Sequence, residues 1–380
     1  MKASFATELT GVVAITLLVV LAAAAWSRPQ PAAEAPSAGY KVLAPISHKN
    51  LTIFPVVAAT THDTRMFLTL DEGLRSGEVV ITEAGQVQGL LRRRRGTPLP
   101  PRRDGAEVNR LVLVNNSSRP LLLLAGEIVS GGKQDRVVGK DRIVPPNSDP
   151  VDLSVFCVEP GRWVATSATF GGIGSGSVGG IGTGAYATPM AQPSVRAGAM
   201  AKKSQQEVWS EVRNSASAME TVVGAPAAAP LHSTTSYARV MSNEDVQKQV
   251  DAVAAPVERS YQSVIGELRR QNAVGVVVAI NGELVWADIF ASTPLLEKYW
   301  PKLVRSYATE AVTRRGKAES ASVKEAQAFL DNRNGTRQMV ETEPGVFRHT
   351  EIVGQGFHAF ELASLLPKTG FDVHVSKMAE

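Results

Sequence analysis

The sequence predicts an α+β protein whose N-terminal part is β-rich, as a sandwich or small barrel, and whose second part combines a hairpin with several helices. Two patterns predict this class. Short apolar runs separated by turn clusters fill the first half, whereas apolar residues recur at helical spacing in the second half. Hydrophobic residues make up 44% of the 380 residues and charged residues 20%, which is typical of a globular chain and excludes a disordered or collagen-like one.

The chain begins with an export signal. Residues 12–26 are an unbroken apolar run (VVAITLLVVLAAAAW) that follows Lys2, and Ala23 and Ala25 fit a cleavage site of small residues. This run is shorter than the roughly 20 residues that span a bilayer, which favours a cleaved signal peptide, while Glu8 keeps an uncleaved anchor open. We therefore expect an exported protein that is periplasmic or membrane-anchored and faces outward.

Shifts in composition divide the chain into six parts. These are a signal peptide or anchor (1–26), a Pro/Ala-rich linker (27–40), a β-rich domain (41–165), a Gly/Ser-rich flexible insertion (166–200), an α+β part packing on the first (201–366) and a tail (367–380). Within the insertion, Gly174–Gly179 matches the dinucleotide-binding pattern. Later glycines and Pro189 prevent the helix that this pattern requires, so we expect no cofactor.

Six strands are expected in the β-rich domain. They are Leu51–Ala58, Glu78–Thr82, Leu111–Val114, Leu121–Leu124, Arg136–Val144 and Val151–Val158. An Arg-rich segment, 91–105, interrupts them. It lacks aromatic residues, so a solvated hairpin loop is favoured over a site for a polyanion or a membrane surface.

Helices and a hairpin are expected after residue 200. Ser204 and Glu207 form a capping box, Ser242 caps a helix that Pro256 interrupts or restarts, and Thr293-Pro294 begins another helix. Asn281-Gly282 joins strands 275–280 and 283–290 into a hairpin, Ser322 caps a shorter helix, and two or three strands follow around residues 343–345.

Charge, histidine and cysteine content exclude several classes of protein. A net charge of +4 is low for a nucleic-acid-binding protein of this length, so no nucleic acid partner is expected. The single cysteine, Cys157, excludes a disulfide within the chain. No two of the six histidines lie two to five residues apart, so no metal site is expected.

Candidate ligand-binding residues lie in the segment that begins at Glu127. Gly131 and Gly132 form a turn at which backbone N–H groups can approach an anion closely. Lys133 and Arg136 are the cations of this segment, and Gln134 adds an amide between them. Alternatively, Glu127 pairs with an arginine and the two glycines are only a hairpin turn.

A second group of candidates surrounds the end of the strand at Cys157. Because side chains alternate along a strand, Cys157 and Glu159 share one face, and Arg162 and Trp163 follow. An arginine fork and an indole ring suit a phosphate and a flat ring. Cys157 is either a reactive thiol or a small core residue, and Trp163 either stacks on a ligand or fills the core.

The segments LLLLAGEIVSGGKQDRVV (121–138) and VDLSVFCVEPGRW (151–163), which contain these candidates, resemble the domain family named for its association with ADP-ribosylglycohydrolases and rhodanese-like phosphatases. The resemblance covers roughly residues 45–165 and 200–310 and includes GVVVAINGELVWADIF. It implies a link to ADP-ribose or nicotinamide dinucleotide metabolism. The positions that match the family are Glu127, Gly131, Gly132, Gln134, Arg136, Cys157, Glu159, Arg162 and Trp163.

Three hypotheses about function follow. In the first, the domain binds or hydrolyses an ADP-ribose-like or other phosphorylated small molecule, with Glu127 or Glu159 as the general base. In the second, it is a non-enzymatic interaction module of the cell envelope, with a protein partner still to be identified or with the membrane contacted through residues 12–26. In the third, Cys157 performs thiol catalysis.

Overall fold

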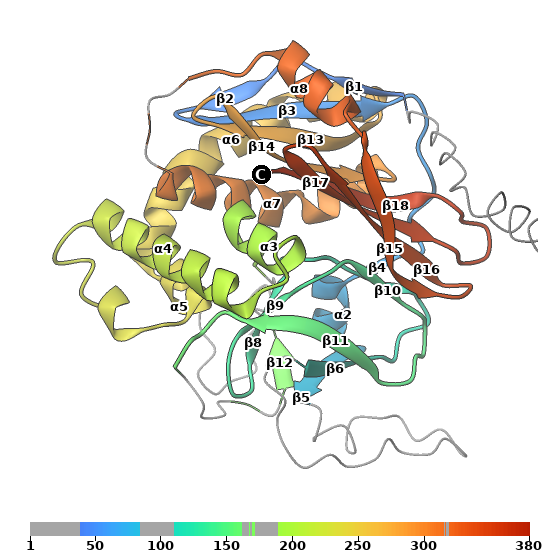
Figure 1. The fold of residues 1–380 in the computed structure, drawn as a ribbon, viewed down its shortest axis with the longest axis horizontal. Coiled ribbons are helices and arrows are strands. Elements are labelled where there is room, and N and C mark those ends of the chain that lie inside the picture. The colour runs from blue at the N-terminus through green and yellow to red at the C-terminus, as the bar shows by residue number, and fades with distance from the viewer. Residues whose placement is uncertain are drawn as a thin grey trace, which may run out of the picture. The chain divides into compact units, whose positions relative to one another are not determined.

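The predicted α+β class is confirmed. The computed structural model describes residues 39–83, 110–161, 167, 169–171, 189–314, 316 and 319–380, and Gly39–Glu380 forms one compact unit (Figure 1). The described residues form seven α-helices and eighteen strands. None of these helices is long and apolar enough to cross a membrane. The apolar run 12–26 and the Arg-rich segment lie outside the described residues, so both interpretations stay predictions.

Strands of the N-terminal part close into a barrel, one of the two forms expected for it. The six strands, in order around the barrel, are β11 (Val151–Cys157), β6 (Arg110–Asn115), β5 (Val79–Glu83), β12 (Thr169–Gly171), β8 (Ile128–Gly131) and β9 (Arg136–Val138). The run expected as one strand, 136–144, is two, because the chain turns at Gly139–Asp141 before β10 (Arg142–Val144). Leucine, isoleucine and valine side chains from the barrel strands fill its interior.

A small sheet and a helix lie next to the barrel. The sheet has the order β10, β7 (Leu121–Leu123) and β4 (Leu68–Thr69). Helix α2 (Leu70–Ser76) begins at a capping box in which the Thr69 hydroxyl accepts from the Glu72 amide and the Glu72 carboxylate accepts from the Thr69 amide.

The largest sheet joins both ends of the described chain. Its order is β1 (Tyr40–Val42), β3 (Leu51–Ala58), β13 (Ala273–Ile280), β14 (Glu283–Phe290), β18 (Asp372–Ala379), β17 (Phe357–Ser364), β16 (Phe347–Gly354) and β15 (Gly335–Glu343), with β2 (Ile46–His48) also paired to β3. Strand β18, from the segment interpreted as a tail, lies between β14 and β17. Four strands, not two or three, therefore end the chain.

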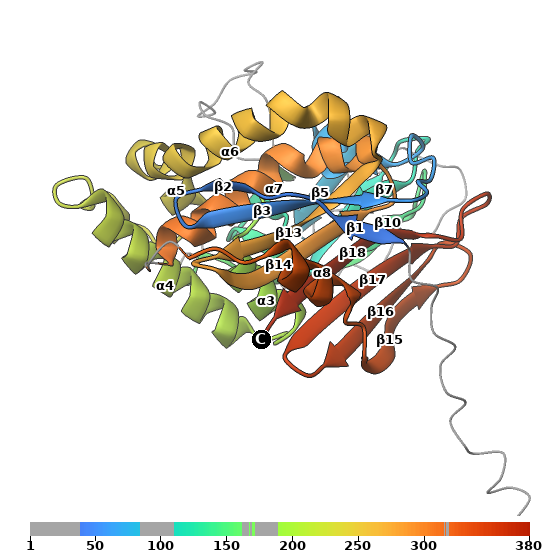
Figure 2. The same ribbon diagram turned by 90° about the horizontal axis from the view of Figure 1, so that it is seen from above.

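Helices cover both faces of this sheet (Figure 2). The two longest, α6 (Glu244–Arg270) and α7 (Thr293–Thr313), pack on the β3–β13–β14 face, and α8 (Val323–Asp331) covers the other. Between the barrel and α7 lies α3 (Pro193–Met200), followed by α4 (Gln205–Val223), the 3₁₀ turn η2 (Leu231–Ser233) and α5 (Tyr237–Ser242). The end of the Gly-rich segment is thus helical, and its residues 172–188 lie outside the described residues.

Two helix predictions need correction. Asn243, not Ser242, caps α6, because its side chain accepts from the amides of Asp245 and Val246. Pro256 neither interrupts nor restarts α6, which is continuous from Glu244 to Arg270. Buried side chains on both sides of Pro256 keep the helix packed, which offsets the missing hydrogen bond.

The hairpin predicted at Asn281-Gly282 is confirmed. Both residues have positive φ, 53° and 82°, as a two-residue turn between twisted strands requires. Ile280 pairs with Glu283 directly across the turn. This hairpin forms the centre of the large sheet.

A buried network of charges joins the barrel region to the sheet. The imidazole of His374 on β18 lies between two aspartates, with Nδ1 2.5 Å from Asp141 Oδ2 and Nε2 3.2 Å from Asp288 Oδ1. Arg196 of α3 donates two hydrogen bonds to Asp288, at 2.8 and 2.9 Å, and stacks 4.2 Å from the Trp286 ring. All four charged side chains are fully buried. Their charges cancel, as burial requires.

Protonation of His374 therefore contributes to stability. Burial alone disfavours the charged ring, but Asp141 and Asp288 outweigh that effect and raise the pKa of His374 to about 9. The stabilisation is complete below the unfolded-state pKa of about 6.5 and is lost as the pH rises through about 9. We expect the free energy of unfolding, measured in urea, to fall by on the order of 3 kcal/mol between pH 6 and pH 9.5.

The His374→Gln variant provides the control for this pH dependence. It should be less stable than the wild type at pH 6 and should lose most of the decline towards pH 9.5. Equal free energies of unfolding for the wild type at the two pH values would contradict the assigned role.

Candidate functional site

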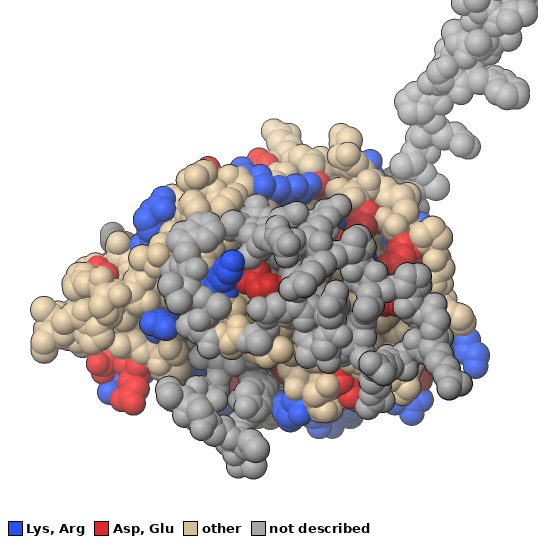
Figure 3. Space-filling model, turned by 90° about the horizontal axis from the view of Figure 1, so that it is seen from below, with Lys and Arg blue, Asp and Glu red and all other residues tan. Residues whose placement is uncertain are grey.

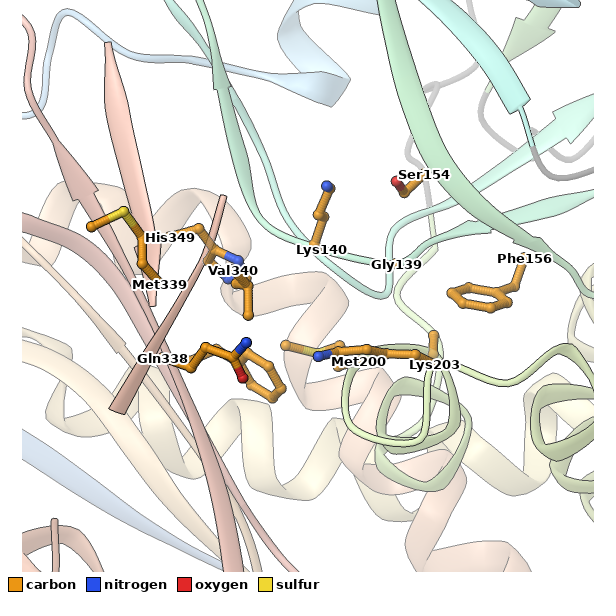
Figure 4. Close-up of a pocket in the computed structure, with 12 residues that line it drawn as sticks. Gly139, Lys140, Ser154, Phe156, Met200, Lys203, Gln338, Met339, Val340 and His349 are labelled. Carbon is orange, nitrogen blue, oxygen red and sulfur yellow. The ribbon is translucent and has the colours of Figure 1, made fainter. Parts of the chain in front are cut away.

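A cavity opens where the barrel, helix α3 and the edge of the large sheet meet. Its volume is about 370 Å³. The barrel side contributes Phe156 of β11, and α3 contributes Met200. The sheet contributes Met339, His349 and Phe360, from β15, β16 and β17 (Figure 4). The walls are thus largely apolar, with polar groups at a few positions, as in binding sites for small molecules.

His349 is the polar side chain deepest in this cavity. It is 2% exposed, and neither ring nitrogen has a hydrogen-bond partner among the described residues. Figure 4 shows the ring pointing from β16 towards Met200 and Lys203 on the opposite wall. Its ring stacks on Phe360 with centroids 5.8 Å apart. The strand positions the ring because Phe347, His349 and Glu351 alternate onto one face of β16.

His349 is neutral at physiological pH. Burial lowers the pKa of the ring, and the nearby charge of Asp141 offsets this only in part. A neutral imidazole offers one N–H donor and one nitrogen acceptor. The site therefore presents a donor and an acceptor side by side in an apolar enclosure.

Two lysines lie at opposite walls of the cavity. Lys140 follows β9 and forms an ion pair with Glu341 of β15. Lys203 follows α3 and pairs with Glu351, with Nζ 2.6 Å from Oε2. Both lysine side chains are partly exposed, and both of their carboxylate partners lie outside the cavity lining.

The polar groups among the described lining residues are spread over several elements of the cavity wall. The described lining residues do not pair a nucleophile with a base, since Ser154 is exposed and His349 lacks an orienting hydrogen bond. No group of His, Cys, Asp and Glu among the described residues could hold a metal ion. On the face in Figure 3, the cationic and anionic side chains of the described residues are interspersed.

The glycine turn predicted to bind an anion lies away from this cavity. Its three successive amides donate within the protein: Gly131 to Asp135 Oδ1 at 3.2 Å, Gly132 to Ser167 Oγ at 3.1 Å, and Lys133 to Glu83 Oε1 at 3.2 Å. A Cβ on Gly132 would lie 2.3 Å from the Phe170 ring, so close packing accounts for this glycine. Anion binding at this turn stays a prediction.

Gln134, Cys157 and Glu159 do meet in space. The thiol of Cys157 donates to Gln134 Oε1 at 2.9 Å, and Gln134 Nε2 donates to the carbonyl of Glu159 at 3.1 Å. Glu159 Oε2 accepts from the Asp135 amide at 3.2 Å. Burial raises the pKa of the Cys157 thiol to about 11, although the charge of Arg136 acts in the opposite direction. These contacts explain the segment as a buried hydrogen-bonded cluster.

Glu127 belongs to a different cluster. Its Oε1 accepts from Lys302 Nζ of α7 at 2.8 Å, and its Oε2 accepts from the Leu124 amide at 2.8 Å. Lys302 also pairs with Asp71 of α2 at 2.6 Å. Burial would lower the pKa of Lys302, but the two carboxylates outweigh it and raise that pKa. The cluster links α2, the β7–β8 connection and α7.

The two candidate catalytic residues, Glu127 and Glu159, contact opposite ends of β9. The backbone carbonyl of Glu127 accepts from the Val138 amide at one end, whereas the carboxylate of Glu159 accepts from the Asp135 amide beyond the other. At about 3.3 Å per residue these positions are about 10 Å apart along the strand. Arg136 is buried on β9 beside Cys157. Arg162 and Trp163 lie outside the described residues.

Sequence reasoning missed His349 and the two lysines. The alternation of Phe347, His349 and Glu351 in a predicted terminal strand was the available signal, since it placed a histidine on an inward face. The opposite wall could not be inferred, because Phe156 and Met200 lie about 150 to 200 residues away in the chain.

Comparison with known families gives one match. The model of the ARG and Rhodanese-Phosphatase-superfamily-associated Protein domain matches residues 39–378, which is most of the chain. No curated protein and no solved structure matches it.

The Glu127 cluster should behave as a structural ion pair. The Lys302→Met variant leaves two carboxylates without their shared cation, so we expect its free energy of unfolding to fall by about 3–5 kcal/mol. Glu127→Gln should cost less, because Lys302 keeps its ion pair with Asp71 and the new carbonyl oxygen still accepts from Lys302, although the NH2 group then faces the Leu124 amide. Urea unfolding of both variants tests this order, and equal losses would contradict it.

Cys157 should be unreactive in the folded protein. Its thiol is buried and its pKa is about 11, so little thiolate forms at neutral pH. We expect iodoacetamide at pH 7.5 to modify Cys157 only after denaturation, as measured by intact mass. Rapid modification of the folded chain would instead support the hypothesis of thiol catalysis.

Proposed function

The chain belongs to the ARG and Rhodanese-Phosphatase-superfamily-associated Protein domain family, and we propose that in this member the domain binds a small organic molecule in the His349 cavity. The observation that carries this proposal is the pair of unpartnered ring nitrogens on His349. A buried polar group without a partner costs about 1–3 kcal/mol of stability, and a bound ligand would recover that cost.

The lining restricts the shape of the ligand. A volume of about 370 Å³ is near the lower end of the roughly 300–1,000 Å³ of small-molecule sites. Phe156, Met200 and Phe360 offer flat or adaptable apolar contacts. A compact ring system with a donor and an acceptor at one edge matches these walls and His349 together.

Two expectations from the sequence enter this proposal. An ADP-ribose-like or other phosphorylated compound is the first class of ligand to test, because the family resemblance implies it. We also propose that the protein is exported or membrane-anchored through residues 12–26. Hydrolysis and the role as an envelope interaction module stay predictions, since Arg162, Trp163 and most of residues 172–200 lie outside the described residues.

Replacing His349 separates binding from folding. The His349→Phe variant keeps a flat ring against Phe360 but removes both unpartnered nitrogens, so it should melt no lower than the wild type. We expect it to bind the ligand at least about tenfold more weakly. The measurement is a thermal-shift titration of the full chain with ADP-ribose, nicotinamide dinucleotide, adenosine, nicotinamide and inorganic phosphate.

The matched control is His232→Phe, which changes an exposed histidine outside the cavity. It should leave every ligand-induced shift unchanged. The proposal fails if His349→Phe retains the wild-type shift with the same ligand.

A further inference from the structure

We infer that the ligand of the His349 cavity is an anion and that Lys203 is the residue that selects it. This inference rests on the proposed function and adds the charge of the ligand to it. The expected class is a flat ring that carries one phosphate or one carboxylate group.

The first argument is the charge of the lining. Lys140 and Lys203 are both lining residues, whereas no aspartate or glutamate is among the described residues that line the cavity. His349 is neutral and adds no negative charge. A ligand within these walls therefore meets two ammonium groups, and the carboxylate partner of each lies outside the lining.

The second argument is that the ion pair of Lys203 leaves donors for a ligand. An ammonium group has three N–H donors, and Glu351 accepts one of them. Glu351 also lies within 3.4 Å of His358 Nδ1, so its position is fixed from the other side. Glu351 therefore orients Lys203, while about half of the lysine side chain, 52%, stays exposed.

The third argument is the backbone at Lys203. Its φ is 50°, in the left-handed region that glycine or asparagine adopts more readily than lysine. The residue ends the turn between α3 and α4, next to Ser204, which caps α4. This conformation directs the long side chain from the turn towards Gln338 and His349, as Figure 4 shows.

Lys140 adds a second positive charge at the opposite wall of the cavity, where it pairs with Glu341. It precedes Asp141, whose carboxylate is held by His374 and by the Ala125 amide. These two contacts of Asp141 hold the turn that carries Lys140 in place. The ring of the ligand would lie near His349 and Phe360, with its anionic group towards Lys203.

Matched probes test the inference. Adenosine monophosphate is compared with adenosine, and nicotinate with nicotinamide, by isothermal titration of the full chain at low ionic strength. At least one anionic member should bind about tenfold or more tightly than its neutral counterpart, and added salt should reduce the difference. The phosphate pair and the carboxylate pair distinguish the two forms of the anionic group.

Variants of neighbouring lysines identify the residue. Lys203→Gln should remove most of the preference for the anion without weakening the neutral probe, and Lys203→Arg should restore it. Lys202→Gln removes a positive charge one position away, at a residue that does not line the cavity, and should leave both affinities unchanged.

Three outcomes would overturn the inference: equal binding of the charged and neutral members, an unchanged preference in Lys203→Gln, or no binding of any of the four probes. Failure of the proposed function has a different signature. In that case a probe binds, but His349→Phe leaves its affinity unchanged.

Discussion

The imidazolium of His374 is the contact on which the arrangement of this fold depends. It lies between Asp141, from the turn after β9, and Asp288, from the centre of the large sheet, while Arg196 holds Asp288 from α3. Removing four charges from water costs several kcal/mol for each ion, and only complete pairing returns it. The turn after β9, the large sheet and α3 must therefore bring these four side chains into contact, because otherwise the buried charges have no counter-charge.

The cavity lies beside this network because the same elements form its walls. Lys140 is adjacent to Asp141, Met200 lies one helical turn beyond Arg196, and Phe360 is on β17, which pairs with the strand of His374. Each wall is thus anchored a few residues from a buried ion pair. We expect such anchoring to keep the walls apart without a ligand, so that the proposed binding would require little reordering.

Local patterns in the sequence predicted the elements better than their arrangement. Asn281-Gly282 and the capping residues act through the backbone of their immediate neighbours, so short strings were enough. The place of β18 between β14 and β17 depends on pairing with strands up to about 90 residues away. The partner of Glu127 is Lys302, 175 residues on, and nothing local to either residue indicates the other. Regular strand spacing predicted a sandwich or a small barrel without deciding between the two, and it did not predict the cavity.

Polar satisfaction is the property in which the predicted site differs from the cavity that we propose. Glycine, glutamate and arginine in the segment from Glu127 to Arg136 suggested a ligand, because backbone amides at a glycine turn and charged side chains can hydrogen-bond to one. In the fold the Gly131 and Gly132 amides donate to side chains of the protein, and Glu127 accepts from Lys302. His349 is the buried lining residue whose hydrogen-bonding groups stay unused among the described residues. The sequence indicates where polar residues are concentrated. It does not indicate which of their hydrogen-bonding groups the fold leaves without a partner, and such groups mark the site that we propose.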